Sequence, residues 1–294
     1  MTMSGERYSV SGGGYTAEVA EVGAALAGLW LDGQPVTVEC PPDQLPPKST
    51  GCVLVPWPNR LRDGRYRFDG VDYQLPLTEP ATLNASHGLV KWARWQCLEQ
   101  TTDSVLMGYD LVPQTGYPFQ LRLRLRYTLS DAGLAVTLTA GNVGTTTTAP
   151  FGAGFHPYLD LAAETLDTAQ LLVPAATVLR TDERSLPVEW LPVAGTVFDL
   201  RRSRPLGELR LDHGFGELTG SAVVLRTERR TVEVHWDAAF QYLQVYTPPQ
   251  IGPGRNAVAV EPMSCPADAF NSGAGLVRLE PGAGWTGSWG ITVR

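Results

Sequence analysis

The sequence has few cysteines and no long apolar run. Its cysteines, Cys40, Cys52, Cys97 and Cys265, are widely spaced and too few to cross-link 294 residues. We therefore expect free thiols in a reducing compartment. The N-terminal stretch lacks the apolar segment of a secretion signal, and no apolar run reaches the ~18 residues that a membrane span needs. These absences predict a cytoplasmic protein that does not enter a membrane.

Basic charge is also scarce. Lysine and arginine number 23 against 30 aspartates and glutamates, which gives a formal net charge of −7. Such a chain has little attraction for phosphate backbones or anionic lipid, so nucleic acid is not an expected partner. Only Lys48 and Lys91 are lysines, and we interpret this skew as coding bias without bearing on activity.

Helical periodicity is missing, and 31 glycines and 23 prolines interrupt the chain every few residues. Apolar residues instead alternate with polar ones over residues 121–129 and again over 134–140, on either side of an Asp-Ala-Gly turn. This pattern predicts an antiparallel hairpin. A second hairpin is predicted at 65–68 and 71–75, and further strands at 231–236 and 242–246.

No linker or repeat divides the chain. We therefore predict an all-β fold with little helix, a large antiparallel β-sandwich that forms one domain over residues 1–294.

Several catalytic motifs are absent, namely the phosphate-binding P-loop, the dinucleotide glycine motif, the nucleophile elbow G-x-S-x-G and the zinc motif H-E-x-x-H. Histidines and cysteines do not cluster at metal-ligand spacing. We therefore expect no metal and no cofactor. Residues 252–255 are glycine-rich, but the included proline predicts a turn there and not a phosphate-binding loop.

Two residues are candidates for proton transfer. His156 is followed by Pro157, which favours an extended backbone, and an imidazole among aromatic residues can exchange a proton near neutral pH. A histidine with only a structural role is the commoner case. Glu261 ends an apolar strand and precedes Pro262, so desolvation should raise its pKa toward the range of a general base. The alternative is a glutamate paired with an arginine such as Arg60.

Other polar and aromatic residues are ambiguous when taken singly. His87 lies in a short polar turn and is uninformative alone, and Asp212 stands in a predicted turn. Trp57, Tyr158 and Tyr246 are either platforms on which a sugar ring stacks or ordinary core residues.

Six segments in order resemble the aldose 1-epimerase (galactose mutarotase) family. The similarity extends over roughly residues 50–280, and its segments are Pro56–Gly64 with Tyr66 and Phe68–Gly70, His87–Val90 with Trp92, Gly154–Tyr158, Asp212–Phe215, Leu243–Thr247, and Glu261–Pro262 with Asp268–Asn271. Each segment is weak evidence alone, but together and in this order they are a strong signal. The resemblance implies the family's β-supersandwich, which agrees with the strand pattern.

The resemblance also implies roles for individual residues. Glu261 would be the general base that removes the proton of the anomeric hydroxyl, and His156 the general acid that protonates the ring oxygen. Residues that bind and orient sugar hydroxyls would be Arg60, His87, Asp212 and Gln244, with Asn59 assisting. We expect Glu261 and His156 to flank one pyranose from opposite sides.

The implied activity is interconversion of the α and β anomers of free aldohexoses such as glucose or galactose. One alternative is a hexose-6-phosphate 1-epimerase, for which Arg62, Arg65 and Arg67 offer charge, although alternation on a hairpin would place such arginines on an outer face. The other alternative is a non-catalytic carbohydrate-binding protein. The expected partner is a small-molecule sugar, and we expect a monomer or a homodimer.

Overall fold

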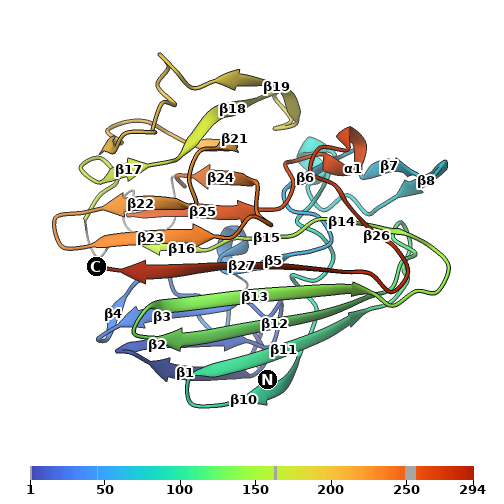
Figure 1. Ribbon diagram of the computed structural model, residues 1–294, viewed down its shortest axis with the longest axis horizontal. Helices are drawn as coiled ribbons and strands as arrows, with labels where there is room; N and C mark the ends of the chain where they lie inside the picture. The colour runs from blue at the N-terminus through green and yellow to red at the C-terminus, as the bar shows by residue number, and fades with distance from the viewer. Residues whose placement is uncertain (1, 45, 162–163, 249–255) are drawn as a thin grey trace.

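The computed structural model describes residues 2–44, 46–161, 164–248 and 256–294 (Figure 1). Strands contain 51% of the residues and helices 4%, which confirms the predicted all-β class. The helical segments of the described part are α1 (Ala269–Ser272), η1 (Pro47–Ser49) and η2 (Pro80–Thr82). The turn predicted at 252–255 lies outside the described residues.

The largest sheet has nine antiparallel strands and covers one side of the molecule (Figure 1). Its strands, in spatial order, are β10 (Gln96–Gln100), β11 (Ser104–Leu111), β12 (Leu121–Ser130), β13 (Gly133–Asn142), β27 (Gly284–Val293), β23 (Thr231–Trp236), β22 (Ala222–Arg226), β17 (Gln170–Leu172) and β20 (Arg204–Pro205). The predicted hairpin is β12 with β13, in a register that runs from Leu121 opposite Asn142 to Ser130 opposite Gly133. The alternation of apolar and polar residues correctly predicted both strands.

The second large sheet has eight strands. Their spatial order is β19 (Pro187–Pro192), β18 (Ala175–Thr181), β21 (Asp212–Leu218), β24 (Tyr242–Tyr246), β25 (Ala257–Met263), β15 (Gly154–Phe155) and β5 (Val53–Leu54), with β16 (Tyr158–Asp160) also paired to β25. The short β15 and β16 therefore share one long neighbour, β25. This arrangement positions the candidate site.

The two large sheets pack face to face through apolar side chains that point inward from alternate positions. Leu125 on β12 is fully buried, as are Leu243 and Val245 on β24. Phe155 of one sheet and Trp289 of the other have ring centroids 5.2 Å apart, so they join the sheets directly. Because successive strand residues point to opposite faces, Tyr242, Gln244 and Tyr246 lie on the face of β24 turned away from this core.

Four smaller sheets complete the fold. They are β1 (Arg7–Gly12), β2 (Tyr15–Ala20), β3 (Leu26–Leu31) and β4 (Gln34–Pro35) in one, then β14 (Ala149–Phe151) with β26 (Val277–Leu279), β6 (Arg60–Arg62) with β9 (Asn84–Ser86), and β7 (Arg65–Phe68) with β8 (Val71–Gln74). The pair β7 and β8 confirms the second predicted hairpin. The cysteines are free thiols, as expected. Within the described ranges, no helix has the length and apolar character needed to cross a membrane.

Candidate active site

His156 and Glu261 face each other because of the register around β25. Gly154 pairs with Met263, and Tyr158 pairs with Ala259, so the same antiparallel register places His156 opposite Glu261. Side chains that stand opposite each other across an antiparallel pair lie on the same face and within contact distance. The atoms His156 Nε2 and Glu261 Oε1 are 3.3 Å apart. Two residues about a hundred positions apart in sequence therefore form one pair.

The pair is almost completely withdrawn from solvent, with side-chain exposures of 6% for His156 and 2% for Glu261. Burial raises the pKa of Glu261 well above its usual range, and the negative charge of Asp212 adds to this effect. The raised glutamate pKa expected from the sequence is thus confirmed. No described residue donates a hydrogen bond to Glu261 Oε2 or pairs with His156 Nδ1.

The expectation of a near-neutral histidine is wrong. Burial lowers the pKa of His156 to about 3, because the charged imidazolium loses its hydration, and the positive charges of Lys91 and Arg60 act in the same direction. With the pKa of Glu261 raised and that of His156 lowered, burial favours a protonated carboxyl beside a neutral imidazole over the charged pair. A protonated carboxyl beside a neutral imidazole has the same proton count as a carboxylate beside an imidazolium.

The small sheet β6–β9 brings three further predicted residues to the same place. Arg60 pairs with Ser86, and the backbone N–H of His87 donates to the Asn59 carbonyl at 2.9 Å. Asn59 and His87 both have left-handed backbone, with φ of 56° and 61°. The His87 and His156 rings meet edge to face with centroids 5.5 Å apart. Burial and the neighbouring His156 lower the pKa of His87 well below its usual value.

Strands β21 and β24 supply the remaining predicted residues. Gln244 is paired with Glu261 on one side and with Gly214 on the other, so it lies directly beside the catalytic candidate. Its side-chain amide donates to Asp212 Oδ1 at 2.7 Å. Asp212 is exposed at the rim, whereas Gln244 is buried.

These residues line one pocket of about 190 Å³. It contains every site residue predicted from the sequence, together with residues that sequence reasoning did not assign to the site or left open: Lys48, Ser49, Glu79, Lys91, Tyr158 and Tyr246. Arg60 Nε and Glu79 Oε2 form an ion pair at 2.8 Å. The Tyr158 ring stacks on His156 with centroids 5.0 Å apart.

From the sequence, the rarity of lysine is interpreted as coding bias, yet both lysines of the chain, Lys48 and Lys91, line this pocket. Their rarity was the signal that could have identified them.

The structure contradicts one expectation about placement and decides two placements that the sequence left open. Glu261 and His156 touch each other, so they approach a ligand from one side and do not flank it from opposite sides. Trp57 packs on Phe270 with ring centroids 5.7 Å apart and belongs to the core. Cys265, whose place the sequence left open, is buried against Gly152 and fills core space.

The arginines considered for phosphate binding lie outside the pocket. Arg65 Nε donates to Gln74, and Arg67 pairs with Asp72 across the exposed β7–β8 hairpin. This placement follows from alternation on the hairpin, as the sequence predicted. Arg62, two residues from Arg60 on the same strand β6, is paired with Asp268.

Asp268 anchors β6 and thereby positions Arg60. Its Oδ1 accepts hydrogen bonds from the Arg62 backbone N–H at 3.0 Å and from Asn271 Nδ2 at 2.7 Å. Its own backbone N–H donates to the Arg60 carbonyl at 2.7 Å. The acid following Glu261 in the motif therefore acts on the backbone of the arginine segment and does not line the pocket.

The chain is similar to known proteins over nearly its whole length. The aldose 1-epimerase family profile matches residues 6–292. The chain belongs to the aldose 1-epimerase family. It is 36% identical over 286 residues to the uncharacterized protein YihR of Escherichia coli K12, covering 96% of this chain and 91% of YihR. It is 30% identical over 206 residues to galactose mutarotase of Rattus norvegicus, covering 67% of this chain and 59% of that enzyme.

Solved structures show the same fold. The GalM/aldose epimerase homologue from C. elegans superposes with a TM-score of 0.87 at 20% identity, covering 98% of each chain. Galactose 1-epimerase from Lactobacillus acidophilus gives a TM-score of 0.80 at 23% identity, covering 97% of this chain and 92% of that one. The sheets described above are therefore the galactose mutarotase-like fold, as predicted.

We predict that Asp268→Ala destabilises the protein and loosens the arginine segment. The change removes a buried carboxylate and leaves the Arg62 backbone N–H without its acceptor, which typically costs about 1–3 kcal/mol. The free energy of unfolding, measured by urea titration, should fall by this amount. The matched control is Asp72→Ala, which breaks an exposed pair and should leave stability unchanged. Equal effects of the two substitutions would contradict the anchoring role.

Proposed function

We propose that the chain is a mutarotase that interconverts the α and β anomers of free aldohexoses such as glucose or galactose. The proposal is carried by one observation, the buried contact of 3.3 Å between His156 and Glu261 at a pocket of polar residues. When the pair holds one proton, one member is an acid and the other is a base. Mutarotation needs this combination and no other reagent.

The proximity of the two groups suits the chemistry. The anomeric hydroxyl oxygen and the ring oxygen are bonded to the same carbon, so the groups that serve them must lie close together. The reacting form of the pair is the carboxylate beside the imidazolium, which has the same proton count as the uncharged form. In it, Glu261 takes the hydroxyl proton while His156 delivers a proton to the ring oxygen, and the bond between the anomeric carbon and the ring oxygen breaks. Rotation of the free aldehyde and closure with the roles exchanged give the other anomer.

The surrounding side chains provide the contacts that a hexose requires. Arg60 and His87 offer donors on one side, and the hydrogen-bonded Asp212 and Gln244 offer an acceptor and an amide on the other. Tyr246, which is half-buried, adds aromatic surface for the apolar face of the ring. Asn59 Oδ1 accepts a hydrogen bond from the Arg60 backbone N–H at 2.8 Å, so Asn59 assists by positioning Arg60.

A second candidate function is favoured by the lysines. Lys48 and Lys91 are the chain's two lysines, both line the pocket, and neither has an ion-pair partner in the described part of the chain. Ammonium groups beside a sugar pocket suit a hexose that carries an anion, such as a hexose 6-phosphate. Arg62, Arg65 and Arg67, by contrast, give this candidate no support.

We predict that Glu261→Gln and His156→Gln each lower the mutarotation rate about 10²- to 10⁴-fold, the usual contribution of a general acid or base. The assay is polarimetry of fresh α-glucose and α-galactose, corrected for the spontaneous rate. His235→Gln, at a half-buried histidine on β23, is the matched control and should keep full activity.

Two results would reject this assignment. A wild-type chain no faster than buffer on all common aldoses excludes the enzyme. Sugar binding without catalysis, equal in wild type and Glu261→Gln, would instead support a carbohydrate-binding protein.

We predict a pH profile unlike that of an ordinary histidine enzyme. Because burial lowers the pKa of His156 to about 3, the acid limb of kcat/KM, where protonation of His156 leaves the pair without a base, should lie far below pH 6.5, the unperturbed pKa of histidine. Because burial raises the pKa of Glu261, the alkaline limb, where the pair loses its one proton, should lie above the ordinary range of a carboxyl group. A rise of kcat/KM with pH that is centred near 6.5 in the polarimetric profile would contradict the lowered histidine pKa.

Comparison of glucose with glucose 6-phosphate at low ionic strength separates the two candidate functions. The free-sugar proposal predicts that glucose is turned over at least as well as the phosphate. A higher kcat/KM for the phosphate, lost in the double variant Lys48→Gln/Lys91→Gln and weakened by salt, would establish the second candidate. Arg65→Gln, outside the pocket, is the control and should leave the ratio unchanged.

A further inference from the structure

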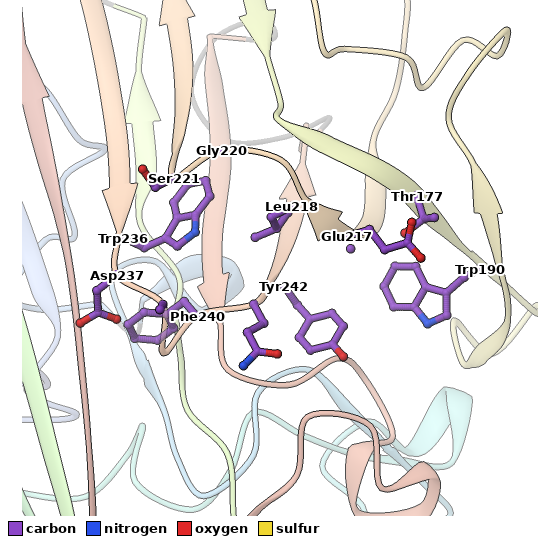
Figure 2. Close-up of a pocket in the computed structure, with 13 residues that line it drawn as sticks. Thr177, Trp190, Glu217, Leu218, Gly220, Ser221, Trp236, Asp237, Phe240 and Tyr242 are labelled. Atoms are coloured by element: carbon purple, nitrogen blue, oxygen red, sulfur yellow. The ribbon is translucent and has the colours of Figure 1, made fainter.

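A larger cavity, of about 730 Å³, lies at the other end of strands β21 and β24 (Figure 2). Its aromatic lining residues are Trp190 from β19, Trp236 from β23, Phe240 from the turn before β24, and Tyr242 at the start of β24. Its polar lining residues include Thr177, Glu217, Ser221, Asp237 and Gln241. None of these residues belongs to the catalytic pocket.

Two half-buried rings form the wall of this cleft. The Trp190 and Tyr242 centroids are 5.8 Å apart, with the rings tilted by 35°, and Figure 2 shows them on one side of the cavity, with Glu217 and Thr177 beside Trp190. Each ring packs on a glycine. A Cβ at Gly216 would lie 2.9 Å from Trp190, and one at Gly275 would lie 2.8 Å from Tyr242. Both rings therefore pack against backbone, which restricts their movement, while part of each ring remains exposed to solvent.

The charge of the cleft selects against anions. Its only charged lining residues, Glu217 and Asp237, are acidic. The Asp237 carboxylate is already occupied, since it accepts hydrogen bonds from the backbone N–H groups of Ala239 and Ser288. No hydrogen bond to a described residue engages the Glu217 carboxylate or the Gln241 amide. Aromatic faces beside free acceptors and an amide, without a cation, match a neutral polyhydroxylated ring.

The cleft continues the sheet face that holds the catalytic pocket. Tyr242 and Gln244 are two residues apart on β24, so their side chains share a face and are separated by about 7 Å along the strand. On the neighbouring strand β21, Gly214 is paired with Gln244. Two residues further along the same strand, Gly216 is paired with Thr177, which lines the cleft. A ligand in the cleft would therefore lie next to the catalytic pocket and outside it.

We propose that the cleft lined by Trp190 and Tyr242 is a second carbohydrate-binding site that takes a neutral saccharide unit. Stacking on the two rings provides the main contact, and Glu217 and Gln241 hydrogen-bond the hydroxyl groups. The site goes beyond mutarotation and does not depend on it, because none of its residues takes part in the proposed proton transfer.

The test uses saccharides blocked at the anomeric position, which the catalytic pair cannot open: methyl β-cellobioside, methyl β-lactoside and methyl α-maltoside. Binding is measured by saturation-transfer NMR and calorimetry on the full chain. We expect at least one probe to bind the wild type, with affinity about tenfold weaker in Trp190→Ala, which removes a stacking surface. Leu191→Ala, at the exposed next residue of the same strand, is the matched control and should bind like wild type.

Glucose mutarotation should be the same in both variants, which separates failure of this site from failure of the catalytic proposal. A second measurement covers the case in which Trp190→Ala does not fold. The indole N–H resonance of Trp190, assigned with Trp190→Phe, should shift when the wild type is titrated with the probe. The proposal is overturned if no probe binds the wild type, if the folded alanine variant binds within twofold of it, or if that resonance does not move.

Discussion

The register of β25 is the constraint on which the candidate site depends. This strand pairs with β24 on one side and with both β15 and β16 on the other. Gln244, Glu261 and His156 consequently stand in one row across the sheet. A shift of one residue would turn Glu261 toward the apolar face that packs on the nine-stranded sheet. Val258 and Val260 are fully buried on that opposite face. A shift of register would expose these apolar side chains, and the free-energy cost of that exposure fixes the register.

Burial of the pair has an energetic cost that the rest of the fold must offset. A carboxylate loses several kcal/mol of hydration inside a protein unless it is paired or protonated. Two large sheets joined by contacts such as Phe155 with Trp289 form a continuous core that offsets this cost. The inner face of β24 therefore serves stability, while its outer face is left for polar residues.

Prediction from sequence succeeded where the information was local. Alternation identified the β12–β13 hairpin, and short motifs led to Glu261 and His156 as candidates. Prediction from sequence failed where several segments that are distant in the chain form one site. Lys91 and Glu79 reach the pocket only through the packing of loops around the β6–β9 pair, and the lowered pKa of His156 follows from a burial that no local pattern reveals. The contact between Glu261 and His156 is likewise a property of strand pairing, which the motifs do not encode.

The shared proton explains why burial suits a reversible ring opening. In the proposed reaction, Glu261 gains the proton of the anomeric hydroxyl as His156 gives its own proton to the ring oxygen. The pair thereby passes from carboxylate and imidazolium to carboxyl and imidazole without exchange with water. The second state is the one that the raised pKa of Glu261 and the lowered pKa of His156 favour. Burial thus stabilises the pair in the form that accompanies the open aldehyde, and ring closure on either face of the carbonyl restores the first form.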